Sequence, residues 1–234
     1  MHDAILPDNF LTADLRQFVE ALLLAIAALL PIVNPLGSAP VYLAKTIDLD
    51  PGQYADLARR VAINSFLLLL ASLLIGAYVL DFFGLSVPIV QVAGGIVVCS
   101  MAWALLNQPD QPPASVRDAA HALPHTDLGV RAFYPLTMPL TVGPGSISVA
   151  ITLGANHAAG VRSLIIYSLA HTVGIIVVSI FVFLSYRYAQ SILRRLGPTG
   201  TVVLVRMSAF ILLCIGVQIA WNGVSALLRG VHAA

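Results

Sequence analysis

Two apolar stretches of the chain contain clusters of proline, glycine and hydroxyl-bearing residues. Residues 31–40 read Pro-Ile-Val-Asn-Pro-Leu-Gly-Ser-Ala-Pro, and residues 135–146 read Pro-Leu-Thr-Met-Pro-Leu-Thr-Val-Gly-Pro-Gly-Ser. A proline in a helix interior removes a backbone donor and costs about 3 kcal/mol, so each cluster predicts a broken helix. The free N–H groups at the start of a half-helix attract carboxylates, and freed carbonyls accept hydrogen bonds from ammonium groups. Both clusters therefore predict a site for a small zwitterion.

The predicted substrate-binding residues come from both clusters. We expect Ser38 and Ser146 to be the N-caps of the half-helices that follow the breaks. The solute's ammonium group would meet freed carbonyls, such as those of Pro31 and Thr141, or the side-chain amide of Asn34. The alternative is that the prolines only kink two structural helices. The full predicted set is Asn34, Pro35, Gly37, Ser38, Thr137, Thr141, Gly143, Gly145 and Ser146.

His171 is an ionisable side chain close to the centre of an apolar run. It is a candidate proton relay, because an imidazole titrates near neutral pH. A neutral histidine bonded to another helix is an equally good interpretation. A rival function is an intramembrane hydrolase with Ser146 as nucleophile and His171 as base. Because Ser146 is expected to be a cap and no third catalytic group is evident, we predict neither an enzyme nor a metal site.

The composition indicates what must position these residues. Of 234 residues, 59% are hydrophobic and 10% are charged, against about 25% charged in soluble domains. A chain with so few charges predicts a membrane protein whose main surroundings are lipid. The formal net charge of +1 excludes an electrostatic argument for nucleic-acid binding. Residues 1–17 carry more aspartate than arginine, unlike a signal peptide, so the first apolar run is expected to remain as a span.

Six apolar runs are long enough to cross a bilayer as helices. Short alternating segments typical of a membrane barrel are absent from the sequence, which predicts an all-α fold. Because each half contains an odd number of spans, the second half would enter the membrane from the opposite side, as an inverted repeat with broken helices 1 and 4. The predicted spans are 18–44, 61–80, 85–106, 132–155, 163–186 and 202–228. The predicted layout is one membrane domain, 1–234, with an external tail at 1–16, helices 1–3 at 17–106, a cytoplasmic proline-containing linker at 107–131 and helices 4–6 at 132–229.

Basic residues in the loops predict the orientation. One side would carry Arg16, Arg162 and Arg229, whereas the loops between spans 1 and 2, 3 and 4, and 5 and 6 hold most of the remaining lysine and arginine. The positive-inside rule then places those three loops in the cytoplasm and both termini outside. A membrane scaffold or regulator without transport is a third functional interpretation. The shortness of the 107–130 loop counts against it, because it leaves no room for a signalling domain.

The two clusters resemble the motifs of a known family. Residues 31–46, around Asn-Pro-Leu-Gly, and residues 132–147, with Phe-Tyr-Pro-Leu and Gly-Pro-Gly-Ser, are similar to the first-helix and fourth-helix motifs of the MarC family of bacterial inner-membrane proteins, also described as the neutral amino acid transporter family. The resemblance implies six spans and, as in some members, transport of small neutral amino acids such as alanine and glycine. It implies no cofactor. Coupling to H⁺ or Na⁺ and assembly into a homo-oligomer are left open.

Overall fold

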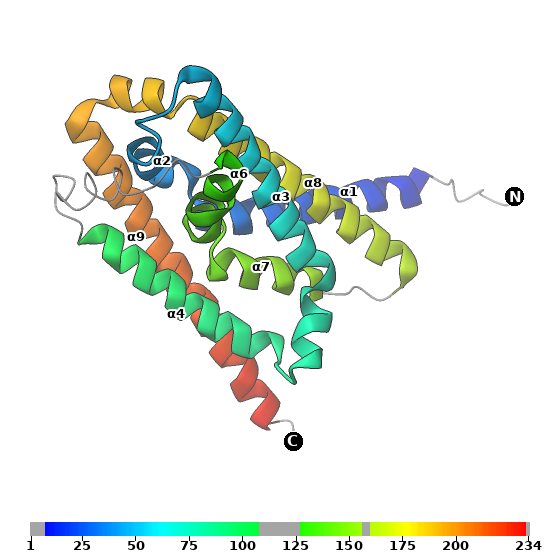
Figure 1. Cartoon of the computed structure of the whole chain (residues 1–234). Helices are drawn as coiled ribbons and strands as arrows, with labels where there is room; N and C mark the ends of the chain where they lie inside the picture. The colour runs from blue at the N-terminus through cyan, green and yellow to red at the C-terminus, as the bar shows by residue number, and fades with distance from the viewer. Residues whose placement is uncertain (1–7, 108–126, 156–159, 233–234) are drawn as a thin grey trace, which may run out of the picture.

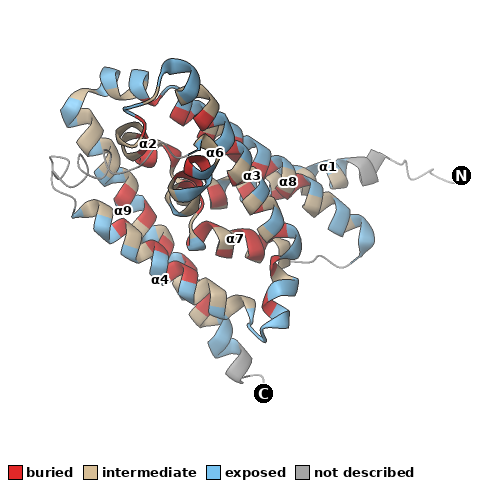
Figure 2. Ribbon diagram, in the orientation of Figure 1, coloured by how far each residue is buried: buried red, intermediate tan, exposed pale blue. Residues whose placement is uncertain are grey.

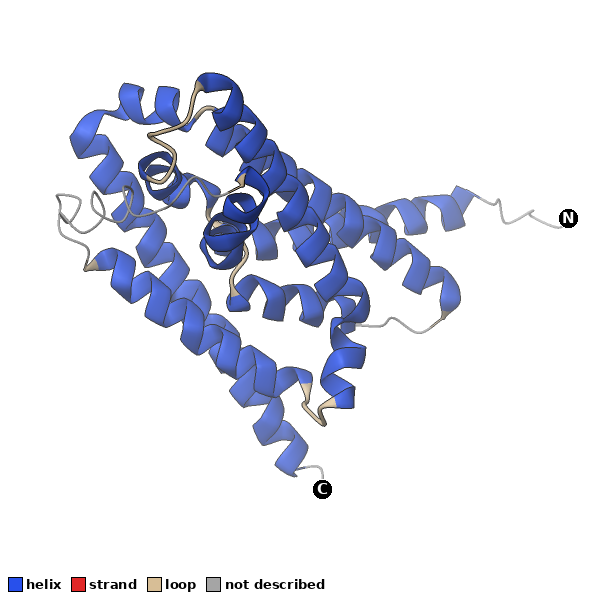
Figure 3. Ribbon diagram, in the orientation of Figure 1, coloured by secondary structure: helices blue, strands red, loops and turns tan. Residues whose placement is uncertain are grey.

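The structure, a computed structural model, describes residues 8–107, 127–155 and 160–232, and all regular structure in these ranges is helical (Figures 1 and 3). The predicted all-α class is therefore confirmed. The elements in chain order are α1 (Asp8–Val33), α2 (Pro35–Ala44), α3 (Pro51–Phe82), α4 (Val87–Leu106), α6 (Leu128–Arg131), the irregular helical segment η1 (Ala132–Thr141), α7 (Pro144–Ala155), α8 (Val161–Arg187) and α9 (Ala189–His232).

The apolar helices match the predicted spans. Within the described ranges, five helical stretches are long and apolar enough to cross a membrane, and a bent pair with a 74° angle between Leu128–Thr141 and Pro144–Ala155 supplies a sixth. The first stretch, Thr12–Ala44, contains both α1 and α2. The fourth predicted span is the bent pair. The chain is thus an all-helical membrane protein with two interrupted spans.

Helices α1, α3 and α9 each begin well before the predicted spans, and a capping box marks the start of α3. Helix α3 begins at Pro51, where Asp50 accepts hydrogen bonds from the N–H groups of Gly52 and Gln53 at 2.9 and 2.8 Å. The Gln53 side chain accepts in return from the Asp50 N–H, which completes a capping box. Helix α9 begins before the predicted sixth span and is interrupted at Gly197, whose φ of 68° suits glycine.

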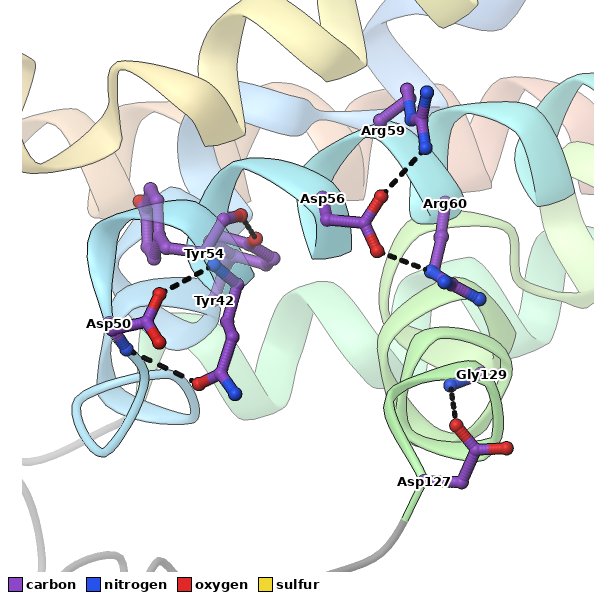
Figure 4. A network of polar contacts seen from close by, with 9 residues as sticks. Tyr42, Asp50, Tyr54, Asp56, Arg59, Arg60, Asp127 and Gly129 are labelled. Carbon is purple, nitrogen blue, oxygen red and sulfur yellow. Dashed lines mark hydrogen bonds and ion pairs between the residues drawn. The ribbon is translucent and has the colours of Figure 1, made fainter.

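Part of the predicted layout lies outside the described residues. This applies to residues 1–7 of the predicted external tail and to residues 108–126 of the predicted linker. The rest of the tail is helical from Asp8, so α1 starts earlier than the predicted span. The last residues of the linker form α6, where Asp127 accepts a hydrogen bond from the Gly129 N–H at 3.0 Å (Figure 4).

Burial follows the arrangement expected in lipid. Buried positions gather on α7 and on the inner faces of the helices around it (Figure 2). Large core side chains such as Leu29, Leu69 and Ile175 are fully buried. Many large apolar residues point outward, including Leu67, Ile165 and Phe210, each more than half exposed. An outward apolar surface is unfavourable in water but suits hydrocarbon.

The two short helices next to the breaks lie inside the bundle. Helix α7 packs on α3, α4 and α1, and α2 packs on α9 and α8 (Figure 1). The long helices α1 and α8 pack on each other, as do α3 and α8. Both interruptions are therefore enclosed by protein, which is the condition for non-helical backbone at membrane depth.

Helices α4 and α9 lie side by side along a glycine seam (Figure 1). A Cβ atom on Gly95 would lie 2.5 Å from the Ala220 backbone nitrogen, and one on Gly216 would lie 2.9 Å from the Cys99 nitrogen. The absence of side chains lets the two backbones approach, as in small-residue packing of membrane helices. The small residues in the third span therefore serve packing.

Contacts group the loops at two ends of the bundle. The Tyr54 hydroxyl donates to the Tyr186 carbonyl at 2.7 Å, which places the start of α3 beside the end of α8. Arg162, at the start of α8, forms an ion pair with Asp14 near the start of α1. The N-terminal end of α1 and the turn before α8 thus share the opposite end, as the predicted six-span order requires.

Gly216→Val tests the seam. The branched side chain meets backbone atoms of α4 that cannot rotate away, so we expect a loss of unfolding free energy of about 1–3 kcal/mol. Thermal unfolding in detergent measures the loss as a lower midpoint. Ala226→Val is the matched control, because Ala226 is exposed on the same helix. Equal midpoints for the two variants would contradict the close packing of α4 and α9.

Candidate functional site

The first break is built by Asn34. Its backbone adopts the left-handed conformation, with φ 44° and ψ 54°, which asparagine tolerates better than most residues. Its side-chain oxygen accepts a hydrogen bond from the Gly37 N–H at 3.2 Å, and Pro35 occupies the first helical position of α2. Asn34 is therefore the N-cap of α2. The predicted cap, Ser38, is wrong, because Ser38 lies one turn inside the helix and donates to the Asn34 carbonyl at 2.9 Å.

Gly37 makes room for this cap. A Cβ atom at position 37 would lie 2.4 Å from Nδ2 of Asn34, so only glycine lets the amide fold back over the first turn. Three residues of the run Asn-Pro-Leu-Gly thus have a structural role at the first break. Asparagine turns the chain, proline starts the helix, and glycine admits the capping side chain.

The second break uses threonine hydroxyls. In η1 the residues before each proline, Tyr134 and Met138, adopt extended φ/ψ values, as steric contact with a following proline favours. The hydroxyl of Thr137 donates to the Ala132 carbonyl, and the hydroxyl of Thr141 donates to the Leu136 carbonyl, both at 2.7 Å. A threonine two residues after each proline therefore satisfies a carbonyl that the broken helix would leave free.

The turn 143–145 redirects the chain into α7. The Ser146 hydroxyl donates to the Gly143 carbonyl at 2.9 Å from inside the first turn, so its predicted role as N-cap is also wrong. A Cβ atom on Gly145 would lie 1.9 Å from Cγ2 of Val98. Glycine here lets α7 start directly against α4. Because Pro144 lacks an N–H, the free first-turn donors of α7 are the N–H groups of Gly145 and Ser146.

Tyr186 joins the two breaks. Its hydroxyl lies 3.0 Å from Oγ of Ser38 and 2.8 Å from Oγ1 of Thr141, and its side chain is fully buried. Ser38 comes from the helix after the first break and Thr141 from the end of the second, so one hydroxyl of α8 contacts both. We call Ser38, Thr141 and Tyr186 the hydroxyl node. Two of its three members were predicted from the sequence.

The hydroxyl node has fewer protons than contacts. Ser38 and Thr141 each contact a backbone carbonyl and the Tyr186 hydroxyl, which makes four contacts. Each hydroxyl carries a single proton, so the three residues can satisfy only three of these contacts at one time. An additional hydrogen-bond donor would complete the node.

Aromatic contacts hold Tyr186 in place. Its ring stacks on that of Tyr42 with centroids 4.4 Å apart and an interplanar angle of 5°. Tyr54 packs edge-on against Tyr42 at 5.3 Å and accepts, through its carbonyl, a hydrogen bond from the Tyr42 hydroxyl at 3.1 Å (Figure 4). Stacking fixes the ring of Tyr186, so its hydroxyl is held between the breaks.

An ion pair closes the bundle beyond these tyrosines. Two guanidinium nitrogens of Arg131 donate to the two carboxylate oxygens of Asp48 at 2.7 and 2.8 Å. Arg131 also donates to the carbonyl of Lys45, which follows the last residue of α2. This bidentate contact ties the loop after the first span to the start of the fourth span.

The other predicted residues are not brought together at the node. Thr137 is fully buried and bonds within its own segment. His171 precedes Tyr186 by fifteen residues on α8, about 22 Å along a helix. Ser146 and His171 form no hydrogen bond with each other in the described part of the chain. No described cluster of three or more His, Cys, Asp or Glu side chains could hold a metal ion.

Tyr186→Phe and Tyr186→Ala separate the hydroxyl from the ring. Phenylalanine keeps the stack on Tyr42, and both node partners keep their carbonyl acceptors, so we expect a loss of unfolding free energy of about 1 kcal/mol or less. Alanine empties a fully buried site and should cost about 3–5 kcal/mol. Unfolding in detergent measures both, with Tyr188→Ala at an exposed position as control. A loss with phenylalanine as large as with alanine would contradict the role of the ring.

Comparison with known proteins identifies the family. The family model described as "MarC family integral membrane protein" matches residues 19–228. The chain is 29% identical over 216 residues to the UPF0056 membrane protein MJ1677 of Methanocaldococcus jannaschii, covering 92% of this chain and 99% of that protein. It is 29% identical over 202 residues to YvbG of Bacillus subtilis, covering 86% and 92%. It is 26% identical over 222 residues to the UPF0056 inner membrane protein MarC of Citrobacter koseri, covering 93% and 100%.

No solved structure matches the chain. The family match spans the helices from α1 to α9 and includes both breaks and the hydroxyl node. The resemblance first noted at the Asn-Pro-Leu-Gly and Gly-Pro-Gly-Ser motifs therefore extends over most of the chain. The chain belongs to the MarC family of integral membrane proteins.

Proposed function

We propose that this protein is a carrier for small neutral amino acids, with the substrate held between the breaks of the first and fourth spans. One observation carries the proposal: both breaks contact the same buried hydroxyl, that of Tyr186. Broken helices that meet inside a membrane bundle are the usual setting for a transporter's substrate site.

The chemistry of the breaks favours a zwitterion. The N–H groups of Gly145 and Ser146 lie at the positive end of the α7 dipole and suit a carboxylate. The hydroxyl node lacks one proton, and an ammonium group supplies donors. Ser38, Thr141 and Tyr186 carry no formal charge, so a solute with net charge would be held less well at this depth. Alanine and glycine fit this description.

The packing of the helices supports an inverted repeat. If the two halves are exchanged, the contact of α1 with α8 maps onto that of η1 with α3, the contact of α2 with α8 onto that of α7 with α3, and the contact of α2 with α9 onto that of α7 with α4. The contacts of α4 with α9 and of α3 with α8 each map onto themselves. This exchange is the pattern of a pseudo-two-fold axis in the membrane plane.

The hydrogen bonds of the hydroxyl node and the ion pair of Arg131 with Asp48 suggest how the carrier closes. A solute passing between the breaks must separate Tyr186 from Ser38 or Thr141, and each neutral hydrogen bond contributes only about 1 kcal/mol net. The pair of Arg131 with Asp48 lies beyond the node at one end. We infer that the structure is a state closed at that end. Opening it requires that these contacts break while the helices stay folded.

Transport by purified protein in liposomes tests the proposal. Radiolabelled alanine or glycine should exchange by counterflow, and Gly145→Ala should abolish the exchange, because its Cβ would overlap Val98. The double variant Gly145→Ala with Val98→Ala is the matched control. It removes the overlapping methyl groups and should restore exchange.

Two results would count against this account. Absent counterflow across a panel of neutral amino acids would mean that the solute class is wrong. Full exchange by Gly145→Ala alone would mean that the start of α7 is not part of the path. Repeating the assay with imposed pH or sodium gradients shows whether H⁺ or Na⁺ drives movement.

We also propose a cellular location and a membrane orientation for the protein. The protein would lie in a bacterial inner membrane with both termini outside and with the Arg131 end in the cytoplasm, as the loop charges predict. A reporter enzyme that is active only outside the membrane, fused after Ala234, should be active. The same reporter inserted in the linker at 108–126 should be inactive. The reverse pair of activities would invert the orientation and leave the fold unchanged.

A further inference from the structure

A cavity lies away from the hydroxyl node, between α3, α7 and α8. Its volume is about 190 Å³, and its walls include Leu73, Ala77, Leu153, Tyr167 and His171. His171 and Tyr186 belong to one helix but lie about 22 Å apart along it. The cavity is therefore at the end of the bundle opposite to the pair of Arg131 with Asp48.

His171 is buried beside this cavity, and one of its ring nitrogens is unpaired among the described residues. The residue is 3% exposed, and its Nε2 atom finds no donor or acceptor among the described residues. An unpaired buried polar group costs about 1–3 kcal/mol, so a native structure that retains one calls for an explanation. His171 belongs to the cavity wall, so a solute in the cavity that reaches Nε2 would supply the partner.

The remaining wall is mostly apolar with a few polar groups. Leu73, Leu153 and Ala77 offer an apolar surface, while Tyr167 and Ser168 are polar residues of the same wall, and the ring of Tyr167 lies 6.0 Å from the imidazole of His171. Helix α7 ends at Ala155 near this wall, so the negative end of its dipole lies close to the cavity. An apolar pocket with few polar groups is typical of a small-ligand site, and the dipole favours an ammonium group.

The size of the cavity limits the solute. At about 30 Å³ for each water, the volume corresponds to about six waters and hence to about six non-hydrogen atoms. This is the size of alanine. Leu74 and Tyr78, both more than half exposed, line the same cavity, so it is open at one edge.

We propose that this cavity is a second binding site for the same small neutral amino acid. Nε2 of His171 accepts a hydrogen bond from the ammonium group, and Leu73 with Leu153 contacts the side chain. This site lies at the end of the bundle opposite to the pair of Arg131 with Asp48. The solute occupies it before or after it reaches the hydroxyl node. The solute class rests on the proposed function, whereas the site itself rests on the cavity and on Nε2 of His171, which has no partner within the described part of the chain.

Thiol labelling tests the site without relying on transport. In a Cys99→Ser, Cys214→Ser background, Ser168→Cys places a thiol on the cavity wall. Alanine at ten times its dissociation constant should slow maleimide labelling about tenfold, because the free fraction of the site falls by 1 + [L]/Kd. Ser163→Cys, on the same helix outside the cavity and equally half-buried, is the matched control. Its labelling should not change.

Further variants provide an alternative labelling position and test the role of His171. Ala77→Cys supplies the same readout from α3 if Ser168→Cys does not fold. Adding His171→Ala should remove most of the protection, while adding Thr172→Ala, at a neighbouring position outside the cavity wall, should not. Protection that survives His171→Ala would overturn the assigned role of the imidazole.

The outcomes separate this inference from the carrier function. Alanine exchange by the cysteine-free parent without protection by alanine, glycine or serine would overturn the second site and leave the carrier function standing. Protection without exchange would support the site and contradict transport. Absence of both would contradict both proposals.

Discussion

The breaks in two spans can exist at membrane depth only because nearby side chains satisfy the backbone groups that the breaks set free. In hydrocarbon each unsatisfied N–H or C=O costs several kcal/mol. At the first break Asn34 caps α2, so the Gly37 N–H is satisfied and this cost is avoided there. Thr137 and Thr141 satisfy the carbonyls of the second. The rest of the bundle encloses these local solutions and brings them to Tyr186.

Close packing and weak polar contacts have different roles around the breaks. Glycines let backbones approach where a side chain would overlap, as Gly145 does against Val98 and Gly216 does against Cys99. The contact at Gly216 is rigid, because it faces backbone atoms of α4 that cannot rotate away. The hydroxyl contacts of Tyr186 are individually small in net free energy. A bundle held firmly elsewhere and weakly at its centre suits the opening and closing that the proposed carrier function requires.

The apolar runs predicted the helices well, because a bilayer demands about 20 consecutive apolar residues from every span. The prolines likewise marked both breaks. The caps were predicted wrongly, because Asn34 in the left-handed conformation before a proline starts α2 one turn ahead of Ser38. The sequence Pro-Leu-Thr occurs twice at the second break, at residues 135–137 and 139–141. This repetition is a sequence signal for the threonines that satisfy the freed carbonyls. Tyr186 could not have been found, since its partners lie 148 and 45 residues away in the chain.

The central claim is that the two breaks meet at the hydroxyl node and separate during transport. Ser38→Cys with Thr141→Cys, in a background without other cysteines, allows a short bifunctional thiol reagent to join them. Both native hydroxyl oxygens contact the single Tyr186 oxygen, at 3.0 and 2.8 Å, so the new thiols should lie within reach of each other. We predict that cross-linking stops alanine counterflow and that a cleavable reagent restores it when cut. Full counterflow by completely cross-linked protein would contradict the account.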